Sequence, residues 1–331
     1  MPNIIFMQIF FRKGYIVYRD KGKRDFTYVA LHSGPALEIP TSRDDNSETV
    51  ASLCWMKTGG TLIVSTMPRK RAFGIDYNRG IPKKSESLEL FESFLKDQQP
   101  RRLHEFRNVY AWSSHSEEDY RNRMSIYKSF WNEVKSGQTI ALIHSAFNRL
   151  KLVPSIIDIS TFNSRGVDRK LIKLVVDEVN EEYRKFLNEI DRAYKAVVLL
   201  EEERAINNII RVSDAFGLDK MSPEFLEGIK ADLDAIRAYT DKDVMKELEK
   251  NFTPTNFLRA SKKALMNMET PRVTVEHFFR GLKSVAPLKQ LINSGRKRIV
   301  INIECSRFIN FWYPHQAAEM ISKILERLSD S

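Results

Sequence analysis

The chain has 331 residues, of which 42% are hydrophobic and 29% charged, a balance that is typical of a globular protein and excludes a disordered one. The N-terminal apolar run, 4–11, contains a glutamine and is too short to span a bilayer, so we expect no membrane partner and no signal peptide. The only cysteines, Cys54 and Cys305, cannot build a disulfide framework, which indicates a reducing, cytoplasmic compartment. The net charge of +10 favours an anionic partner, but 43 acidic residues are interspersed among the 53 basic ones.

The first half of the chain alternates short apolar runs with helical patterns. Strand-sized runs rich in β-branched residues occur at 28–31, 61–64 and 139–143. Helical patterns occupy 47–57 and 119–135, and glycine follows each of them shortly, as it often does at the end of a helix. Buried strands of a mixed or parallel sheet have this character. We therefore expect an α/β domain.

From 165 to 272 the chain changes character, because helix-forming residues dominate and glycine is rare. Apolar residues recur at three- and four-residue spacing over 168–216, which predicts an amphipathic helix that could run unbroken. A serine followed by proline at 222–223 predicts the start of another helix. Two more are predicted over 241–252 and 255–268.

The mixed character returns after residue 273. A strand is predicted over 298–304, and a closing amphipathic helix over 315–328. The order of these patterns predicts an α/β domain with a mixed sheet sandwiched by helices. We expect 1–164 and 273–331 to form this domain and 165–272 to be inserted into it as a helical subdomain.

Polar residues follow several of the predicted strands. His32 and His144 share the local pattern apolar–apolar–His–Ser at the ends of two strands, and Glu304 lies at the end of a third. Open α/β sheets bind their ligands at this edge. Two histidines and a nearby carboxylate form the ligand set of a catalytic zinc site, in which a fourth position stays open for water. A further carboxylate can then transfer protons.

These residues also have structural interpretations. A histidine after a strand can simply be hydrogen-bonded, an acidic turn can cap the helix that follows it, and the Arg69-Lys70-Arg71 run is typical of a solvated surface. The shared setting of the two histidines favours the metal interpretation. A carboxylate between apolar neighbours, as at Glu304, is unusual because buried carboxylates are rarely unpaired.

Seven short segments carry a family resemblance through their content and their order. They are His32-Ser33-Gly34, Arg43-Asp44-Asp45, Gly59-Gly60-Thr61, Arg71 with Asp76-Tyr77-Asn78-Arg79, Tyr127 to Trp131, His144-Ser145 and Glu304. In these segments the chain resembles the N-formylglutamate amidohydrolase family, whose fold looks related to that of the zinc carboxypeptidases and aspartoacylases. The resemblance covers about 1–163 and 273–331 and does not include the helical segment between them.

The resemblance implies that His32 and His144 bind Zn²⁺ together with one acid of the turn that follows the first histidine. We prefer Asp45 as this third ligand, with Asp44 and Glu48 as alternatives.

The same resemblance implies roles for the other segments. Glu304 would be the general base and then the general acid, and Arg71 would polarise the scissile carbonyl. Asn78 and Arg79 would hold a carboxylate of the substrate. This is chemically consistent, because one guanidinium binds a carboxylate bidentately and a second stabilises a developing oxyanion. We therefore expect a zinc-dependent amidohydrolase that cleaves an amide bond of a small carboxylate-bearing substrate, an N-acyl amino acid or a peptide-like molecule.

Two alternatives belong to other functional classes. The net charge and basic clusters such as Lys83-Lys84 and Arg296-Lys297-Arg298 would suit a nucleic-acid-binding protein on a degenerate hydrolase fold. The helices of 165–272 would suit a protein-interaction module. In an enzyme, the same helices would roof or flank the cleft, or join chains into a homo-oligomer.

Overall fold

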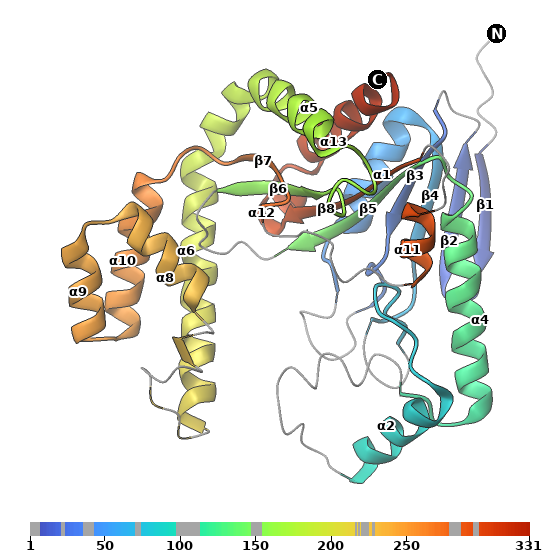
Figure 1. Cartoon of the computed structure of the whole chain (residues 1–331), viewed down its shortest axis with the longest axis horizontal. Coiled ribbons are helices and arrows are strands. Elements are labelled where there is room, and N and C mark those ends of the chain that lie inside the picture. Colours follow the sequence, from blue (N-terminus) through green and yellow to red (C-terminus); the bar gives the residue numbers. More distant parts are fainter. Residues whose placement is uncertain are drawn as a thin grey trace.

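The computed structural model describes residues 7–20, 24–35, 43–69, 74–96, 113–146, 154–215, 217, 219, 225–226, 229–277, 286–293 and 298–331. Within these ranges the chain forms a mixed eight-stranded sheet with helices on both faces (Figure 1). The predicted α/β class is confirmed. No helix of the described ranges combines the length and the apolar character that crossing a membrane requires.

The predicted strands are present, and four further strands complete the sheet. The bounds are β1 Met7–Arg12, β2 Tyr15–Asp20, β3 Phe26–Ala30, β4 Gly60–Ser65, β5 Thr139–Ala146, β6 Ser155–Ser160, β7 Arg272–Val275 and β8 Ile299–Ser306. They lie in the order β1-β2-β4-β3-β5-β8-β6-β7. The central strands β4, β3, β5 and β8 are parallel, whereas β2 and β6 run antiparallel to their neighbours in this central group. The carboxyl ends of β3, β5 and β8 therefore share one edge of the sheet.

The helices fill the connections between these strands. Their bounds are α1 Ser47–Thr58, α2 Lys84–Lys96, α4 Glu117–Val134, α5 Arg169–Glu182, α6 Arg184–Ala215, α8 Lys230–Tyr239, α9 Lys242–Lys250, α10 Pro254–Asn267, α11 Ala286–Ile292, α12 Arg307–Trp312 and α13 Pro314–Ser329. Several begin at capping residues: the side chains of Ser116, Asp168 and Thr253 accept hydrogen bonds from the first backbone amides of α4, α5 and α10.

Two hydrophobic cores cover the two faces of the sheet. Successive side chains of a strand point to opposite faces, so Tyr28 packs in the core that contains α1 and α13, and Val29 packs in the core that contains α4 and α11. The first core is continuous from the sheet into the helices of the 165–272 segment, where it includes Val175, Ile190 and Phe257.

The helix predicted over 168–216 is two helices, α5 and α6, which meet at Tyr183. The ring of Tyr183 lies below the ammonium group of Lys323, and its hydroxyl donates to Glu319, so tertiary contacts with α13 hold the residue at this junction. α5 packs against β7 and α13 as part of the sheet's helical layer, while α6, α8, α9 and α10 extend beyond the sheet (Figure 1). The helix start predicted at 222–223 lies outside the described residues.

Candidate metal centre

His32 is held in a tight turn just after the end of β3. Ser33 Oγ donates to the carbonyl of Ser65 at 2.8 Å, which ties this turn to the end of β4. Gly34 lies against the backbone of Met67, where a Cβ atom would come within 1.9 Å of the carbonyl oxygen. In the His-Ser-Gly segment, the serine and the glycine thus shape the turn that presents the histidine.

Asp44 is joined to His32 through the backbone as well as through the side chain. The amide of Asp44 donates to the carbonyl of His32 at 3.0 Å, and the carbonyl of Asp44 accepts from the amide of Ser47 at 3.1 Å, where α1 begins. The acidic turn is therefore fixed between the end of β3 and the start of α1.

His144 and Glu304 are neighbours in the sheet, directly opposite each other on the parallel strands β5 and β8. Residues paired in this way point to the same face of a sheet. His144 is buried and Glu304 is partly buried, at the same edge as the turn that carries His32. The topology thus brings together residues that are up to 272 positions apart in the chain.

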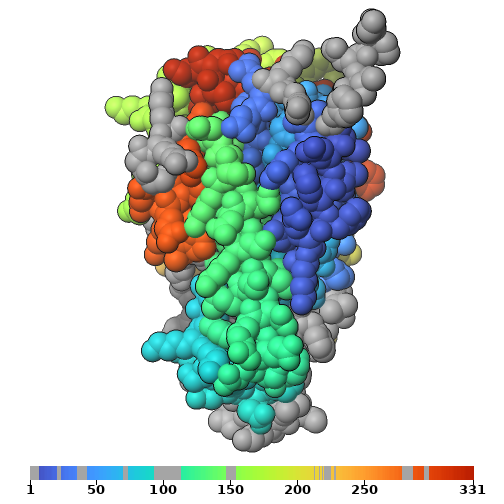
Figure 2. All heavy atoms as spheres, turned by 90° about the vertical axis from the view of Figure 1, so that its right-hand side faces the viewer, coloured from blue at the N-terminus to red at the C-terminus, as the bar shows by residue number. Residues whose placement is uncertain are grey.

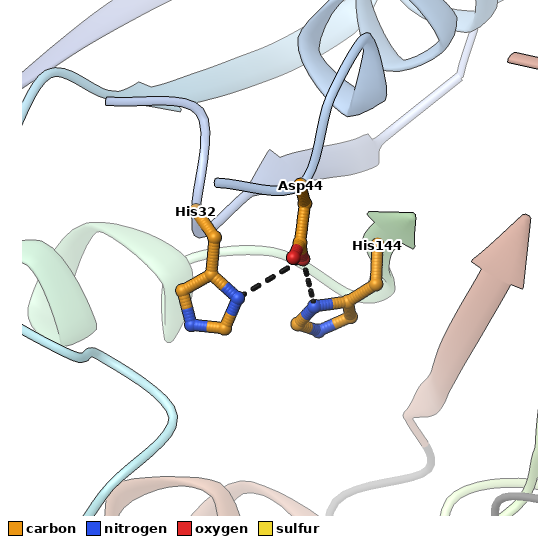
Figure 3. Close-up of side chains that lie close together, drawn as sticks. All are labelled: His32, Asp44 and His144. Atoms are coloured by element: carbon orange, nitrogen blue, oxygen red, sulfur yellow. Dashed lines mark hydrogen bonds and ion pairs between the residues drawn. The ribbon is translucent and has the colours of Figure 1, made fainter. Parts of the chain in front are cut away.

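The three residues His32, Asp44 and His144 form one compact cluster (Figure 3). Asp44 Oδ2 lies 3.0 Å from His32 Nδ1 and 2.8 Å from His144 Nδ1. One ligand atom from each residue lies within 4.8 Å of the others, and all three residues are buried. Two imidazole nitrogens and a carboxylate oxygen, converging on one point, could hold a metal ion.

The donor chemistry of this cluster fits zinc, which binds histidine nitrogen and carboxylate oxygen. The fit extends to the atoms behind the ligands. His32 Nε2 lies 3.0 Å from Asp76 Oδ1, and a metal-binding histidine usually donates its second N–H to such a carboxylate. His144 differs in this respect, because its Nε2 is buried and has no hydrogen-bond partner in the described part of the chain. Both Nδ1 atoms face the centre.

Asp76 lies behind His32. The sequence predicted no separate role for it beyond its place in the Asp76-Tyr77-Asn78-Arg79 segment. Asp76 is buried, and it also accepts from Arg69 Nε and from the amide of Asn78, each at 3.0 Å. Burial alone would raise the pKa of Asp76, but the charge of Arg69 and the contact with His32 bring that pKa well below its ordinary value. Asp76 is therefore a carboxylate that orients His32.

The charges of the cluster shift three further pKa values. Burial would raise the pKa of Asp44, but His32 and His144 lower it far below the ordinary range. Burial would lower the pKa of His144, but Glu304 and Asp44 raise it. The pKa of Glu304 is raised, chiefly by burial, although Asn302 Nδ2 donates to Glu304 Oε1 at 3.1 Å and opposes the shift. Glu304, whose pKa is raised, thus lies near Asp44, whose lowered pKa keeps it anionic.

The structure corrects the preference for Asp45 as the third ligand. Asp45 Oδ2 pairs with the guanidinium of Arg307 at 2.6 Å. Glu48, on the first turn of α1, pairs with Arg43, which precedes the helix. Asp44, which the sequence analysis kept as an alternative, is the acid that joins the two histidines. The backbone bond from Asp44 to His32 holds Asp44 next to the first histidine, whereas the neighbouring Asp45 pairs with Arg307.

The residues predicted to bind substrate lie at the rim of the cluster. Arg79 is exposed, and its Nε atom lies 3.8 Å from Asp76 Oδ2. Asn78 is half-buried beside it. Arg71, the predicted catalytic arginine, lies outside the described residues.

Arg69 is a cation that the sequence analysis assigned to a solvated surface. Its guanidinium instead faces two buried carboxylates, with Nη1 3.6 Å from Asp44 Oδ1 and Nε 3.0 Å from Asp76 Oδ2. Burial would lower the pKa of Arg69, but Asp76 and Asp44 raise it, so the group stays charged. Its place in an Arg-Lys-Arg run hid this role, since the run contains no signal that separates one arginine from the next.

No protein-family model matches the chain, and no curated protein matches it. Among solved structures, the fold is similar to the crystal structure of gene product Atu2144 from Agrobacterium tumefaciens. The two chains are 14% identical, the similarity covers 96% of each chain, and the TM-score is 0.47. A similarity this distant assigns neither a family nor an activity.

Proposed function

We propose that the chain is a zinc-dependent amidohydrolase that cleaves an amide bond in a small substrate carrying a carboxylate. The observation that carries this proposal is the convergence of His32 Nδ1 and His144 Nδ1 on one oxygen of Asp44, with Glu304 paired to His144 in the sheet. A structural zinc site would use four protein ligands, whereas three leave an open position.

His32, Asp44 and His144 would hold the ion. Zinc, when bound, supplies a Lewis acid for the carbonyl oxygen and lowers the pKa of a water molecule at the open position. Metal binding needs both Nδ1 atoms unprotonated and directed at the centre. Asp76 favours this state of His32, because it can accept the Nε2 proton and so fix the tautomer.

Glu304 is the proton carrier in this proposal. Its carboxylate takes a proton from the attacking water and delivers it to the nitrogen of the departing amine. A general base is most effective when its pKa lies near the working pH, and burial raises the pKa of Glu304 in that direction. The amide of Asn302 holds one oxygen of Glu304 and leaves the other for the water.

Two arginines would provide positive charge for the substrate. Arg79 is exposed at the rim, where its planar guanidinium can bind a substrate carboxylate bidentately, with Asn78 beside it. Arg69 is fixed by Asp76 and faces the cluster, so its charge is available to a developing oxyanion.

Zinc content and hydrolysis test this proposal together. The purified chain is loaded with zinc, dialysed and analysed by atomic emission; we expect about one zinc ion per chain. His144→Ala should lose most of this zinc, and His315→Ala, which removes an exposed histidine of α13, should keep it. A chain that binds no zinc, or a His144→Ala variant that binds it as well as the parent, would overturn the metal assignment.

Hydrolysis is then measured on N-formyl and N-acetyl derivatives of glutamate and aspartate and on short peptides, each with a free and with an amidated carboxylate. We expect zinc-dependent cleavage of the free acids and a loss of about tenfold in kcat/KM on amidation, because Arg79 then loses a charged, bidentate partner on the substrate. Equal rates on both forms would contradict the role of Arg79. No cleavage of any member by the zinc-loaded chain would contradict the proposed function.

A further inference from the structure

The two outer strands of the sheet are protected very differently. β7 has only four residues, and the backbone of Val273 is hydrogen-bonded to a side chain of α5. The amide of Val273 donates to Asn180 Oδ1, and Asn180 Nδ2 donates to the carbonyl of Val273, both at 2.9 Å. α5 itself packs along β7. This edge of the sheet is closed to another strand.

β1, at the opposite edge, has no such cover from the described residues. All six of its residues pair with β2 one to one, without a bulge, and β1 is the last strand in the sheet order. In an antiparallel pair, every second residue turns its N–H and C=O away from the partner strand. β1 contains no proline, and its one charged residue is Arg12 at the end. The devices that usually prevent edge-to-edge pairing are therefore missing from this strand.

The side chains of β1 add an apolar stripe to this open edge. Met7, Ile9 and Phe11 alternate along the strand, so they share one face, and they are 51%, 41% and 78% exposed. The neighbouring Phe10 points to the other face, where the guanidinium groups of Arg12 and Arg19 each lie 5.2 Å from its ring centroid. Figure 2 looks toward this side of the molecule, where the dark-blue atoms of the first strands form the surface beside the green atoms of α4. An exposed apolar row on an open strand edge is typical of an interaction surface.

We propose that β1 pairs antiparallel with β1 of a second copy of this chain, about a two-fold axis through Ile9. This register places Ile9 opposite Ile9 and Met7 opposite Phe11, so the exposed apolar side chains of both copies meet on one face. Gln8 then lies opposite Phe10, and none of these pairs sets like charges against each other. The strand is thus complementary to itself, which is why a second copy is the occupant that this edge fits. The two eight-stranded sheets join into one.

The mass of the full chain in solution tests the pairing. We expect light scattering at micromolar concentration to give twice the chain mass of 38.5 kDa. Ile9→Lys sets two ammonium groups against each other on the two-fold axis and should yield a monomer with unchanged circular dichroism. Leu174→Lys, at an exposed apolar position of α5, is the matched control and should remain a dimer.

A cross-link tests the register. The two native cysteines are buried, so Ile9→Cys provides an accessible thiol at the axis. Cα atoms of opposite residues in an antiparallel pair lie about 4.5–5.5 Å apart, within reach of a disulfide. Mild oxidation should therefore give a covalent dimer of Ile9→Cys. Phe11→Cys should give none, because its two thiols would lie about 13 Å apart along the strands.

Several results would overturn the proposal. A parent chain that is monomeric up to about 100 µM has no such dimer. A dimer that survives Ile9→Lys but is lost in Leu174→Lys would use the helical segment instead. Open-ended assembly, or capture of a different protein's strand by a monomeric chain, would show that the edge does not close on itself.

Discussion

Two buried carboxylates, Asp44 and Glu276, lie in very different polar clusters of the same sheet. Asp44 Oδ2 lies 3.0 Å and 2.8 Å from the Nδ1 atoms of His32 and His144. Glu276 Oε1 accepts from the amide and hydroxyl of Thr161 and from the amide of Asn163, and Glu276 Oε2 lies 3.2 Å from Arg169 Nε. Both carboxylates are buried and have polar partners, yet of these two clusters only that of Asp44 could hold a metal ion.

The Glu276 cluster stabilises an unusual backbone. Phe162, Asn163 and Ser164 follow one another with φ angles of 57°, 57° and 63°, a left-handed turn that costs roughly 1–2 kcal/mol per residue. The backbone amides that Glu276 binds keep their protons and offer no lone pair to a metal ion. An imidazole Nδ1 without a proton does offer one. The donor type, rather than burial or the number of hydrogen bonds, therefore separates a candidate metal centre from a structural clamp.

The largest difference between the two clusters is expected in the hydrolysis rate, when Glu304 beside the metal centre is replaced in Glu304→Gln. This substitution keeps the shape of the side chain and removes the base, so we expect zinc content to be retained and kcat to fall about a hundredfold or more. Single-turnover hydrolysis and zinc analysis on the same sample measure both. Glu276→Gln, a buried glutamate outside the centre, is the control and should keep its rate. Loss of zinc from Glu304→Gln would make Glu304 a ligand instead of a base.

Asp76→Asn sharpens the comparison at the metal centre. It removes the charge that orients His32, and loss of such a partner usually costs about 10- to 100-fold in metal affinity. Competition with a chromophoric chelator measures the zinc dissociation constant. Asp45→Asn is the matched control, because Asp45 is adjacent to Asp44 in the chain but pairs with Arg307, and its zinc affinity should stay within about twofold. Equal effects of the two variants would contradict the assignment.

At the other cluster, Glu276→Gln should change stability and leave zinc binding unchanged. The amide keeps one acceptor but loses the charge that Arg169 and three donors face, a change of about 1–3 kcal/mol in the free energy of unfolding. Urea unfolding measures it, and zinc analysis is the control. A zinc loss without destabilisation would reverse the roles given to the two clusters.

The smallest effect is a pH dependence of the metal-free chain. Asp44 and Asp76 have lowered pKa values in the folded state, so each stabilises the fold above the unfolded pKa of about 3.9. That contribution is lost as the pH falls through the folded pKa. Unfolding free energy should therefore decrease from pH 5 to pH 3, and less steeply in Asp76→Asn. Identical slopes would show that Asp76 is not held as an anion.

The parts of this molecule that were predictable are those that depend on local pattern. Apolar runs predicted the central strands, and polar residues at their ends predicted His32 and His144, which the structure brings together with Asp44. Glu304 lies opposite His144, and its role stays a prediction. The choice of Asp44 over Asp45 was not predictable, because adjacent acids in a turn carry no local pattern that says which of them faces the histidines. The boundary at Tyr183 was hidden for a similar reason, since helix-forming residues continue on both sides and contacts with α13 hold the junction.

The parallel pairing of β6 with β7 has a consequence for how the chain folds. The segment 161–271 separates these neighbouring strands in the chain, so their pairing closes a long loop and costs chain entropy before it gains contacts. The helices in between depend on local contacts and form much faster. We therefore expect β7 to join the sheet late, once α5 has formed and Asn180 can bind Val273. On this expectation, formation of the helical segment precedes the pairing of β7 with β6 and shortens the search for it.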